Sequence, residues 1–285
     1  MMLVDSHVHV WDPAQLDYAW LPGTGLDRAM LPGQVDRADR EGPVQMIFVQ
    51  ASDGDPLAEA RWIDRLDWPE LIGIVAGADL TRTPEEISEY LSALARIPRV
   101  VGVRHLLQDT DVSEFGELRD GLRHLAERGG TFDACVRHAQ LPALVDLLDA
   151  VPDLTVVLDH LGKPPVDEGL ASPDGRRWSE QIGVLAARPR TYVKLSGLAP
   201  ESADPTTFDA HADAFIERGL EAFGARRSMI GSDWPISTHF GVGGPFSAWA
   251  DRVRRVAGAD DWPLVSGVAA REAYLPGGVS ALRAT

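Results

Sequence analysis

Short apolar runs recur along the whole chain and alternate with segments of helical periodicity. The runs are rich in Val, Ile and Leu, as expected for strands that are covered on both faces. They predict eight strands, at residues 2–10, 45–51, 71–78, 100–107, 131–137, 154–160, 191–197 and 228–233.

The segments between the strands repeat their apolar residues every three to four positions, which predicts helices that bury one face. In residues 84–96, for example, Ile87, Leu91 and Leu94 share a face, and Pro84 suits a first helical turn. The same pattern predicts helices at residues 118–128, 141–150, 208–223 and 247–256.

Eight strands that alternate with helices predict a single α/β domain over residues 1–285, folded as a (β/α)₈ TIM barrel. Such barrels have about 250 residues and carry their active site at the C-terminal ends of the strands. A doubly wound open sheet is the main alternative, but it would usually have a Gly-rich phosphate-binding turn after its first strand. The first strand here ends in His7-Val8-His9 instead.

Composition narrows the class of protein. The chain has 285 residues and a formal net charge of -16, which argues against non-specific nucleic-acid binding. No apolar stretch approaches the roughly 20 residues of a membrane span, and no signal peptide is visible at the N-terminus. A single cysteine, Cys135, fits a cytoplasmic location and means that any metal must be bound by His and carboxylate side chains. The sequence leaves a homo-oligomer open.

Polar residues gather where the predicted strands end. His7 and His9 are two apart on the first strand, so both imidazoles should point to one side. Convergent imidazoles bind a transition metal or orient a substrate, although two hydrogen-bonded core histidines are the simpler alternative. The other strand ends carry Arg104 and His105, Arg137 and His138, Asp159 and His160, Lys194 and Ser196, and Ser232 and Asp233.

Five motifs, in this order, resemble the amidohydrolase superfamily, and within it the amidohydrolase-2 type sugar-lactonase group that includes L-fucono-lactonase, L-rhamnono-lactonase and sulfomuconolactonase. The motifs span almost the full chain: DSHVHVWDP from Asp5, GVRHLLQ from Gly102, LDHLGKPP from Leu158, KLSGL from Lys194 and GSDWP from Gly231. The resemblance implies a (β/α)₈ barrel and hydrolysis of a lactone.

The resemblance also bears on metal use, because some members of the group bind a metal and others work without one. The fourth strand offers Arg104 and His105, where the superfamily's binuclear sites use a bridging carboxylate or a modified lysine. We therefore expect at most one divalent ion, zinc or manganese, held by His7, His9, His160 and Asp233. The alternative is that the histidines bind substrate hydroxyls without a metal.

Asp233 and His160 are the expected catalytic residues. A carboxylate at the end of an apolar strand is costly unless it is paired, and Asp233 could take a proton from an attacking water. The imidazole of His160 could polarise the lactone carbonyl. Strand periodicity predicts that Asp159 points the other way, into a structural role. A helix cap for Asp233 and a structural hydrogen bond for His160 are the simpler alternatives.

Six residues are expected to bind the substrate: Arg104, His105, Arg137, Lys163, Trp11 and Trp234. Arginine offers a fixed fork of donors for hydroxyl and carbonyl oxygens, and Arg137 should point inward because it shares a face with Asp133 and Cys135. Arg104 and His105 are neighbours, so only one of them faces the interior. Ion pairs, a solvated Lys163 and core packing of the tryptophans are the alternatives.

The expected reaction is attack of an activated water on the carbonyl of a sugar-derived lactone. A carboxylated lactone, of pyrone dicarboxylate or muconolactone type, is an alternative substrate, because Arg104, Arg137 and Lys163 could meet two carboxylates. Two further possibilities are a related metal-dependent decarboxylase and a catalytically silent barrel that only binds its ligand. The expected partner is the small-molecule lactone, with no nucleic acid and no membrane.

Overall fold

Eight parallel strands form the centre of the molecule. A computed structural model describes residues 2–37 and 44–276, and its strands pair in chain order from β1 to β8. β8 meets β1 through a bridge between Trp234 and Val8, where the amide of Asp233 donates to the carbonyl of His7 at 2.8 Å. The strands are β1 (Leu3–Val8), β2 (Val44–Val49), β3 (Leu71–Gly77), β4 (Val100–Leu106), β5 (Thr131–Cys135), β6 (Thr155–Leu158), β7 (Thr191–Leu195) and β8 (Ser228–Ile230).

The predicted barrel is therefore confirmed, but several strands end earlier than the apolar pattern predicts. The chain leaves β6 and β8 through left-handed turns, with φ of 54° at His160, 55° at Leu161 and 54° at Asp233. Extended backbone cannot continue through a positive φ. These turns matter because they lie at the end of the barrel where active sites form.

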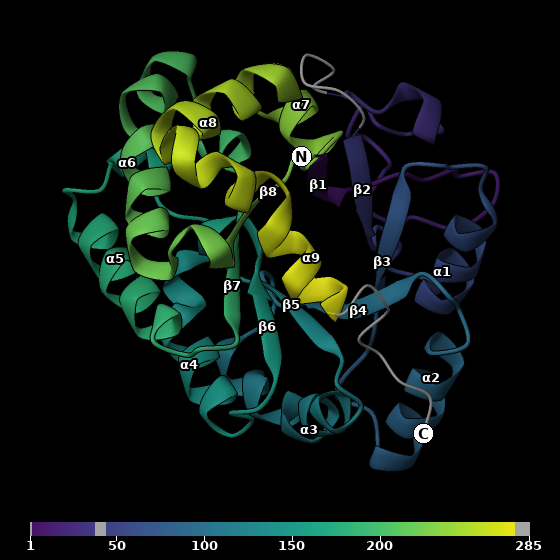
Figure 1. Cartoon of the computed structure of the whole chain (residues 1–285). Helices are drawn as coiled ribbons and strands as arrows, with labels where there is room; N and C mark the ends of the chain where they lie inside the picture. Colours follow the sequence, from purple (N-terminus) through teal and green to yellow (C-terminus); the bar gives the residue numbers. More distant parts are fainter. Residues whose placement is uncertain (1, 38–43, 277–285) are drawn as a thin grey trace.

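Helices surround the barrel, as Figure 1 shows. The five predicted helices are present with shifts of a few residues at their ends. Their first turns carry the expected signals, such as the capping box of Thr83 and Glu86 with Pro84 as the first helical residue. The helices are α1 (Pro56–Arg65), α2 (Pro84–Leu94), α3 (Arg119–Glu127), α4 (Leu141–Asp149), α5 (Pro173–Ala186), α6 (Pro205–Phe223), α7 (Ile236–Phe240), α8 (Phe246–Pro263) and α9 (Ala269–Tyr274).

The last helix, α9, lies across the ring of strands in Figure 1. Its buried residues Ala269, Ala270, Ala273 and Tyr274 form one apolar cluster with side chains from the strands. The strand residues of that cluster are Val4, Ile47, Val49, Val75, Val101, Val157 and Met229. The helix thus closes the N-terminal end of the barrel, and the opposite end is left for a site.

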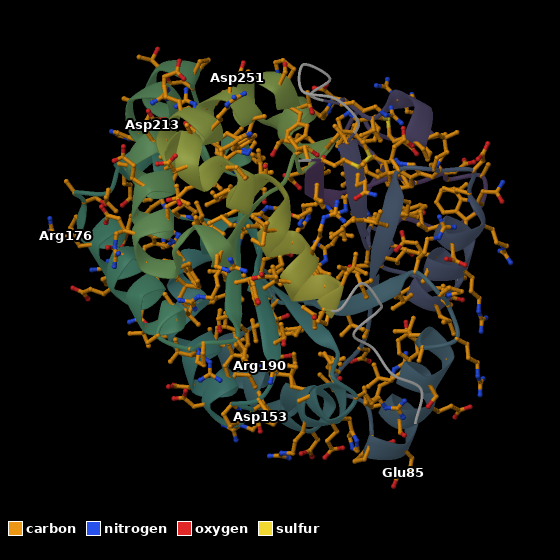
Figure 2. All side chains as sticks on the ribbon, viewed as in Figure 1. Glu85, Asp153, Arg176, Arg190, Asp213 and Asp251 are labelled. Atoms are coloured by element: carbon orange, nitrogen blue, oxygen red, sulfur yellow. The ribbon has the colours of Figure 1, made fainter. Side chains whose placement is uncertain are left out.

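Many charged side chains lie on the outer surface. Figure 2 shows labelled residues such as Glu85, Arg176 and Asp213 at the periphery, on the helices that surround the barrel. Within residues 2–37 and 44–276, no helix combines the length and the apolarity that crossing a membrane requires.

Candidate active site

The two histidines of β1 converge, as their spacing predicts. His7 Nε2 lies 3.1 Å from His9 Nε2, and both residues are buried. His9 is oriented by its other ring nitrogen, which lies 2.8 Å from the carbonyl oxygen of Val49. His9 lines a cavity at the C-terminal end of the barrel, and His7 is fully buried beside it.

Asp233 faces this pair from the turn after β8. Its Oδ1 lies 3.5 Å from His9 Nε2 and 3.8 Å from both His7 Nε2 and His160 Nε2. Its Oδ2 accepts a hydrogen bond of 2.7 Å from the hydroxyl of Ser237, in the first turn of α7. The carboxylate therefore has one oxygen held by the protein and one turned towards three imidazoles.

His160 completes the floor from the turn after β6. Its Nδ1 lies 2.9 Å from the hydroxyl oxygen of Ser196, and its ring packs directly over Gly197. A Cβ at Gly197 would lie 2.3 Å from His160 Nδ1, so only glycine leaves room for the imidazole. One prediction is wrong: Asp159 points into the barrel, the same way as Val157 two residues before it. His160 reaches the same interior because the left-handed turn breaks the alternation at His160 itself.

A fully buried layer of charge lies beneath the histidines. The ammonium of Lys194 is 2.5 Å from Asp133 Oδ2, 2.9 Å from Asp159 Oδ1 and 3.1 Å from His7 Nδ1. The hydroxyl of Tyr274, from α9, donates to the carboxylate of Asp133 at 2.7 Å. The layer connects the helix at the base of the barrel to the floor of the cavity.

Burial and neighbouring charge shift the pKa values of these groups. Burial lowers the pKa of His160 to about 4, although the carboxylates of Asp233 and Asp159 oppose the shift. For Asp233, burial alone would raise the pKa, but the imidazoles of His160, His9 and His7 hold it below its usual range. Burial lowers the pKa of His7, and the charge of Lys194 adds to that effect. At neutral pH the site therefore presents the ionised carboxylate of Asp233 beside the neutral imidazoles of His7 and His160.

The cavity above this floor has a volume of about 330 Å³. The residues that line the cavity differ in character around the barrel. Trp20 and Pro200 come from the segments after β1 and β7, and Ile236 begins α7. Most of the polar lining residues lie on β4 or in the segments that follow β2, β4 and β6. The polar and charged lining residues are His9, Gln50, Asp53, Arg104, Gln108, Asp109, His160, Lys163 and Asp233. The size and the mixed lining suit a small polyhydroxy compound.

Of the neighbours Arg104 and His105, only Arg104 faces the cavity. It is 7% exposed, and its guanidinium donates to the side chain of Gln50 at 3.2 Å and also to the Gln50 carbonyl. His105 points outward, where its Nδ1 accepts a hydrogen bond of 3.2 Å from the amide of Leu80. His105 does not line the cavity.

Three more of the expected substrate residues lie outside the cavity lining. Arg137 is exposed and contacts Asp109, because β5 ends at Cys135 and the chain turns before Arg137. The indole of Trp11 is buried and donates to the carbonyl of Arg28 at 2.9 Å. Trp234 is buried in the hydrophobic core.

Lys163 does line the cavity, as the sequence predicts. Its ammonium pairs with Glu201 at 3.2 Å, so it is not the solvated lysine of the simpler alternative. Trp20, from the loop after β1, also lines the cavity and provides an aromatic face there.

Several residues of the site were not predicted from the sequence. Lys194 and Asp133 carried a usable signal, since a charged side chain inside an apolar strand needs a partner. Gln50 follows β2 directly, but an uncharged amide gives a weaker signal than the charges at the other strand ends. Ser237 had no such signal, because its contact with Asp233 depends on the turn that follows β8.

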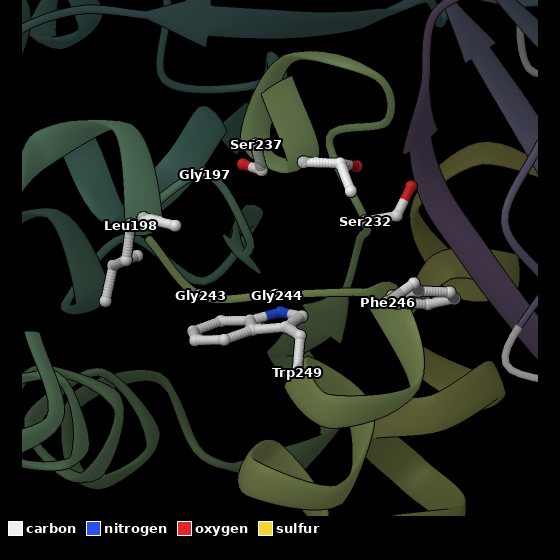
Figure 3. Close-up of a pocket in the computed structure, with 10 residues that line it drawn as sticks. Gly197, Leu198, Ser232, Ser237, Gly243, Gly244, Phe246 and Trp249 are labelled. Atoms are coloured by element: carbon white, nitrogen blue, oxygen red, sulfur yellow. The ribbon is translucent and has the colours of Figure 1, made fainter. Parts of the chain in front are cut away.

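A second, much smaller pocket lies behind Asp233. Figure 3 shows it between Trp249 and the serines Ser232 and Ser237, and its volume is about 20 Å³. That space suits about one water molecule and is too small for a sugar ring. It adjoins the serine that holds Asp233, so it belongs to the structure around the site.

The described residues include donors that could hold a metal ion. His7, His9 and Asp233 offer ligand atoms within 4.8 Å of one another, and His7, Asp159 and His160 form a second such group. Two imidazoles and a carboxylate suit a borderline metal such as zinc. The donor set therefore fits one divalent ion.

Comparisons with known proteins agree with this fold. A family model described as Amidohydrolase matches residues 4–261. An L-fucono-1,5-lactonase of Burkholderia ambifaria is 30% identical and aligns with 87% of each chain, and an L-rhamnono-gamma-lactonase of Scheffersomyces stipitis is 26% identical over 82% of this chain and 85% of its own. A zinc-bound amidohydrolase of Burkholderia multivorans, 27% identical, superposes with a TM-score of 0.82 over 96% of this chain and 99% of its own.

The fold and the site thus define a hydrolase built on a TIM barrel. The chain belongs to the amidohydrolase family.

Proposed function

We propose that the protein opens the ring of a neutral sugar-derived lactone. The observation that carries the proposal is the Asp233 carboxylate, which is buried among His7, His9 and His160 at the floor of a cavity of about 330 Å³. Relatives that are named for L-fucono-1,5-lactone and L-rhamnono-gamma-lactone support the substrate class.

The charges of the lining favour a neutral substrate over a dicarboxylate. Two cations, Arg104 and Lys163, face the cavity, and each already has a partner in Gln50 or Glu201. Three carboxylates, from Asp53, Asp109 and Asp233, share the lining. Two substrate carboxylates would meet this negative charge without free cations to balance them, whereas hydroxyl groups can use both the donors and the acceptors.

The proposed reaction proceeds by general base catalysis. Asp233 Oδ1 takes a proton from water while the water oxygen bonds to the lactone carbonyl carbon. His160 and Arg104 donate hydrogen bonds to the oxyanion and the hydroxyls of the substrate. The tetrahedral intermediate then breaks its bond to the ring oxygen, which receives the proton from Asp233. The product is a hydroxy acid.

One divalent ion, zinc or manganese, would be held by His7, His9 and Asp233, with His160 nearby. When bound, such an ion supplies a Lewis acid for the carbonyl oxygen and lowers the pKa of a coordinated water. Asp233, His160 and Arg104 have the same roles in positioning and proton transfer whether or not an ion is bound.

We further infer that the chain works as one domain, since the barrel runs from β1 to β8 and α9 closes its base. A cytoplasmic location is supported by the single cysteine, Cys135, which is a buried free thiol. A homo-oligomer stays a prediction.

The test is a substrate panel on the purified full-length chain. Acid release, followed with a pH indicator, is measured with neutral 1,5- and 1,4-aldonolactones, with a pyrone dicarboxylate and with a muconolactone. Carbon dioxide release is measured with aromatic carboxylates. Hydrolysis of at least one neutral aldonolactone supports the proposal. Turnover of only the carboxylated compounds, by either reaction, would overturn it.

A further inference from the structure

Lys194 is an unusual residue for this chain. Of its 27 basic residues, only Lys163 and Lys194 are lysine, and both lie at the site. Lys194 is completely buried on β7, directly beneath the ring of His7. An ammonium group carries three rotatable donors on one atom, whereas the donors of arginine form a rigid planar fork.

Two groups lie close enough to His7 Nδ1 to be its hydrogen-bond partner, and their geometry distinguishes them. Lys194 Nζ lies 3.1 Å away in hydrogen-bonding geometry, whereas Asp159 Oδ1 lies 3.3 Å away. Among the described residues, neither carboxylate oxygen of Asp159 receives a directed hydrogen bond. An N–H at His7 Nδ1 would therefore be poorly aimed at Asp159 and would face an ammonium group. The partner of Nδ1 is the donor, Lys194.

The contacts between His7 and His9 agree with Lys194 as the donor to His7 Nδ1. An ammonium cannot accept a hydrogen bond, so His7 Nδ1 carries the lone pair and the neutral ring has its proton on Nε2. His9 Nδ1 lies 2.8 Å from the carbonyl oxygen of Val49, which only accepts, so His9 has its proton on Nδ1. His9 Nε2 is then free to accept from His7 Nε2, 3.1 Å away. The Lys194 contact of His7 and the Val49 contact of His9 both predict that His7 donates and His9 accepts.

We propose that Lys194 is a positioning residue that holds His7 with its proton on Nε2 and thereby joins His7 and His9 in a hydrogen bond that competes with metal binding. To ligate through Nε2, His7 must move its proton to Nδ1, where it meets the ammonium of Lys194. Lys194 thus weakens the affinity of the site for a divalent ion. The inference is independent of the identity of the substrate.

The direct test needs no substitution of Lys194. The full-length protein is labelled with ¹⁵N-histidine, treated with a chelator, and examined at neutral pH by long-range ¹H–¹⁵N correlation. The chain has eight histidines, and His7 is assigned by comparison with His7→Gln. We expect an unprotonated Nδ1 and a protonated Nε2 for His7. A proton on Nδ1 would overturn the proposal.

Substitution tests the effect on metal affinity. Zinc affinity is measured by calorimetry in wild type, in Lys194→Met and in Lys163→Met, which loses the same charge from the same site but has its ammonium on Glu201. We expect about tenfold tighter zinc binding in Lys194→Met, the size of effect that groups behind metal ligands usually have. The His7 proton should move to Nδ1 in the same variant. Lys163→Met should leave the His7 proton on Nε2 and bind zinc less than tenfold more tightly.

Lys194→Met also removes the ammonium that pairs with Asp133 and Asp159, which costs stability. The double variant Lys194→Met with Asp133→Asn removes one of these charges, and circular dichroism checks that each variant is folded. Equal zinc affinity in the two lysine variants, or weaker binding in a folded variant without Lys194, would contradict the proposed competition. The ¹H–¹⁵N spectrum of the wild-type protein locates the His7 proton even if the Lys194 variants do not fold.

Discussion

Single residues at the floor of the site adopt backbone conformations that side chains rarely take. His160 and Asp233 both have a φ of 54°, and the turn at each residue aims its side chain into the cavity. Such conformations cost about 1–3 kcal/mol each, so the surrounding contacts must hold them. The sequence predicted the convergence of His7 and His9, which follows from strand periodicity. It could not predict the directions of His160 and Arg137, because the chain leaves the strand before each of them. The inward direction of Asp159 was missed because the alternation was counted from His160 rather than from Val157.

Gly197→Ala tests how closely the site is built around His160. The new Cβ would lie 2.3 Å from His160 Nδ1 and would displace the ring. We expect kcat to fall by about 100-fold, the usual effect of a misplacement of about 1 Å. Gly224→Ala is the matched control, because Gly224 also has a positive φ, of 73°, but apart from its chain neighbours no atom of the described residues lies within 4 Å of its new Cβ. Equal kcat values in the two variants would show that the ring of His160 is not placed by Gly197.

Among the secondary-structure elements, α9 has a role that its position in the chain does not reveal. It packs against the strands inside the base of the barrel, and Tyr274 reaches the carboxylate of Asp133 on β5. The sequence predicted the alternation of strands and helices, because each element has its own periodicity. It did not predict this contact, since the two residues are 141 positions apart.

Tyr274→Phe tests that contact. The change removes a donor from a buried carboxylate while keeping the aromatic ring, so we expect the free energy of unfolding to fall by about 1–3 kcal/mol. Tyr192→Phe is the control, because its hydroxyl has no hydrogen bond to the described residues. Urea unfolding measures both variants. A loss in Tyr192→Phe as large as that in Tyr274→Phe would contradict the role assigned to the hydroxyl of Tyr274.

At the scale of the whole molecule, the buried histidines make stability depend on pH. Burial lowers the pKa of His160 from 6.5 in the unfolded chain to about 4 in the folded one. Between these values the unfolded state takes up a proton that the native state does not, so stability falls as the pH falls. For His160 the loss amounts to about 3 kcal/mol between pH 6.5 and 4.

His160→Gln should therefore lose less stability on acidification than wild type does. The measurement is urea unfolding, followed by tryptophan fluorescence, at a series of pH values across this window. The difference between the two proteins should shrink as the pH falls from 6.5 to 4. A constant difference over the whole window would contradict a buried, neutral His160.

The eight strands, their order and the end of the barrel that carries the site all follow from patterns in the chain. Each strand has an apolar run, and parallel strands joined by helices place their polar C-terminal residues together. The cavity itself does not follow from those patterns, because contacts such as those of Arg104 with Gln50 and of Lys163 with Glu201 join residues that are distant in the chain. The proposed function therefore depends most on Asp233, which the sequence and the structure place at the same point of the site.

The most direct test of the central claim is the kcat of Asp233→Asn for opening a neutral aldonolactone, compared with that of wild type. The substitution keeps the size of the side chain but removes the base, and circular dichroism checks that the fold is intact. We expect kcat to fall by about 10²–10⁴-fold, the usual contribution of a general base. A folded Asp233→Asn variant that opens the lactone at the wild-type rate would contradict the proposed mechanism.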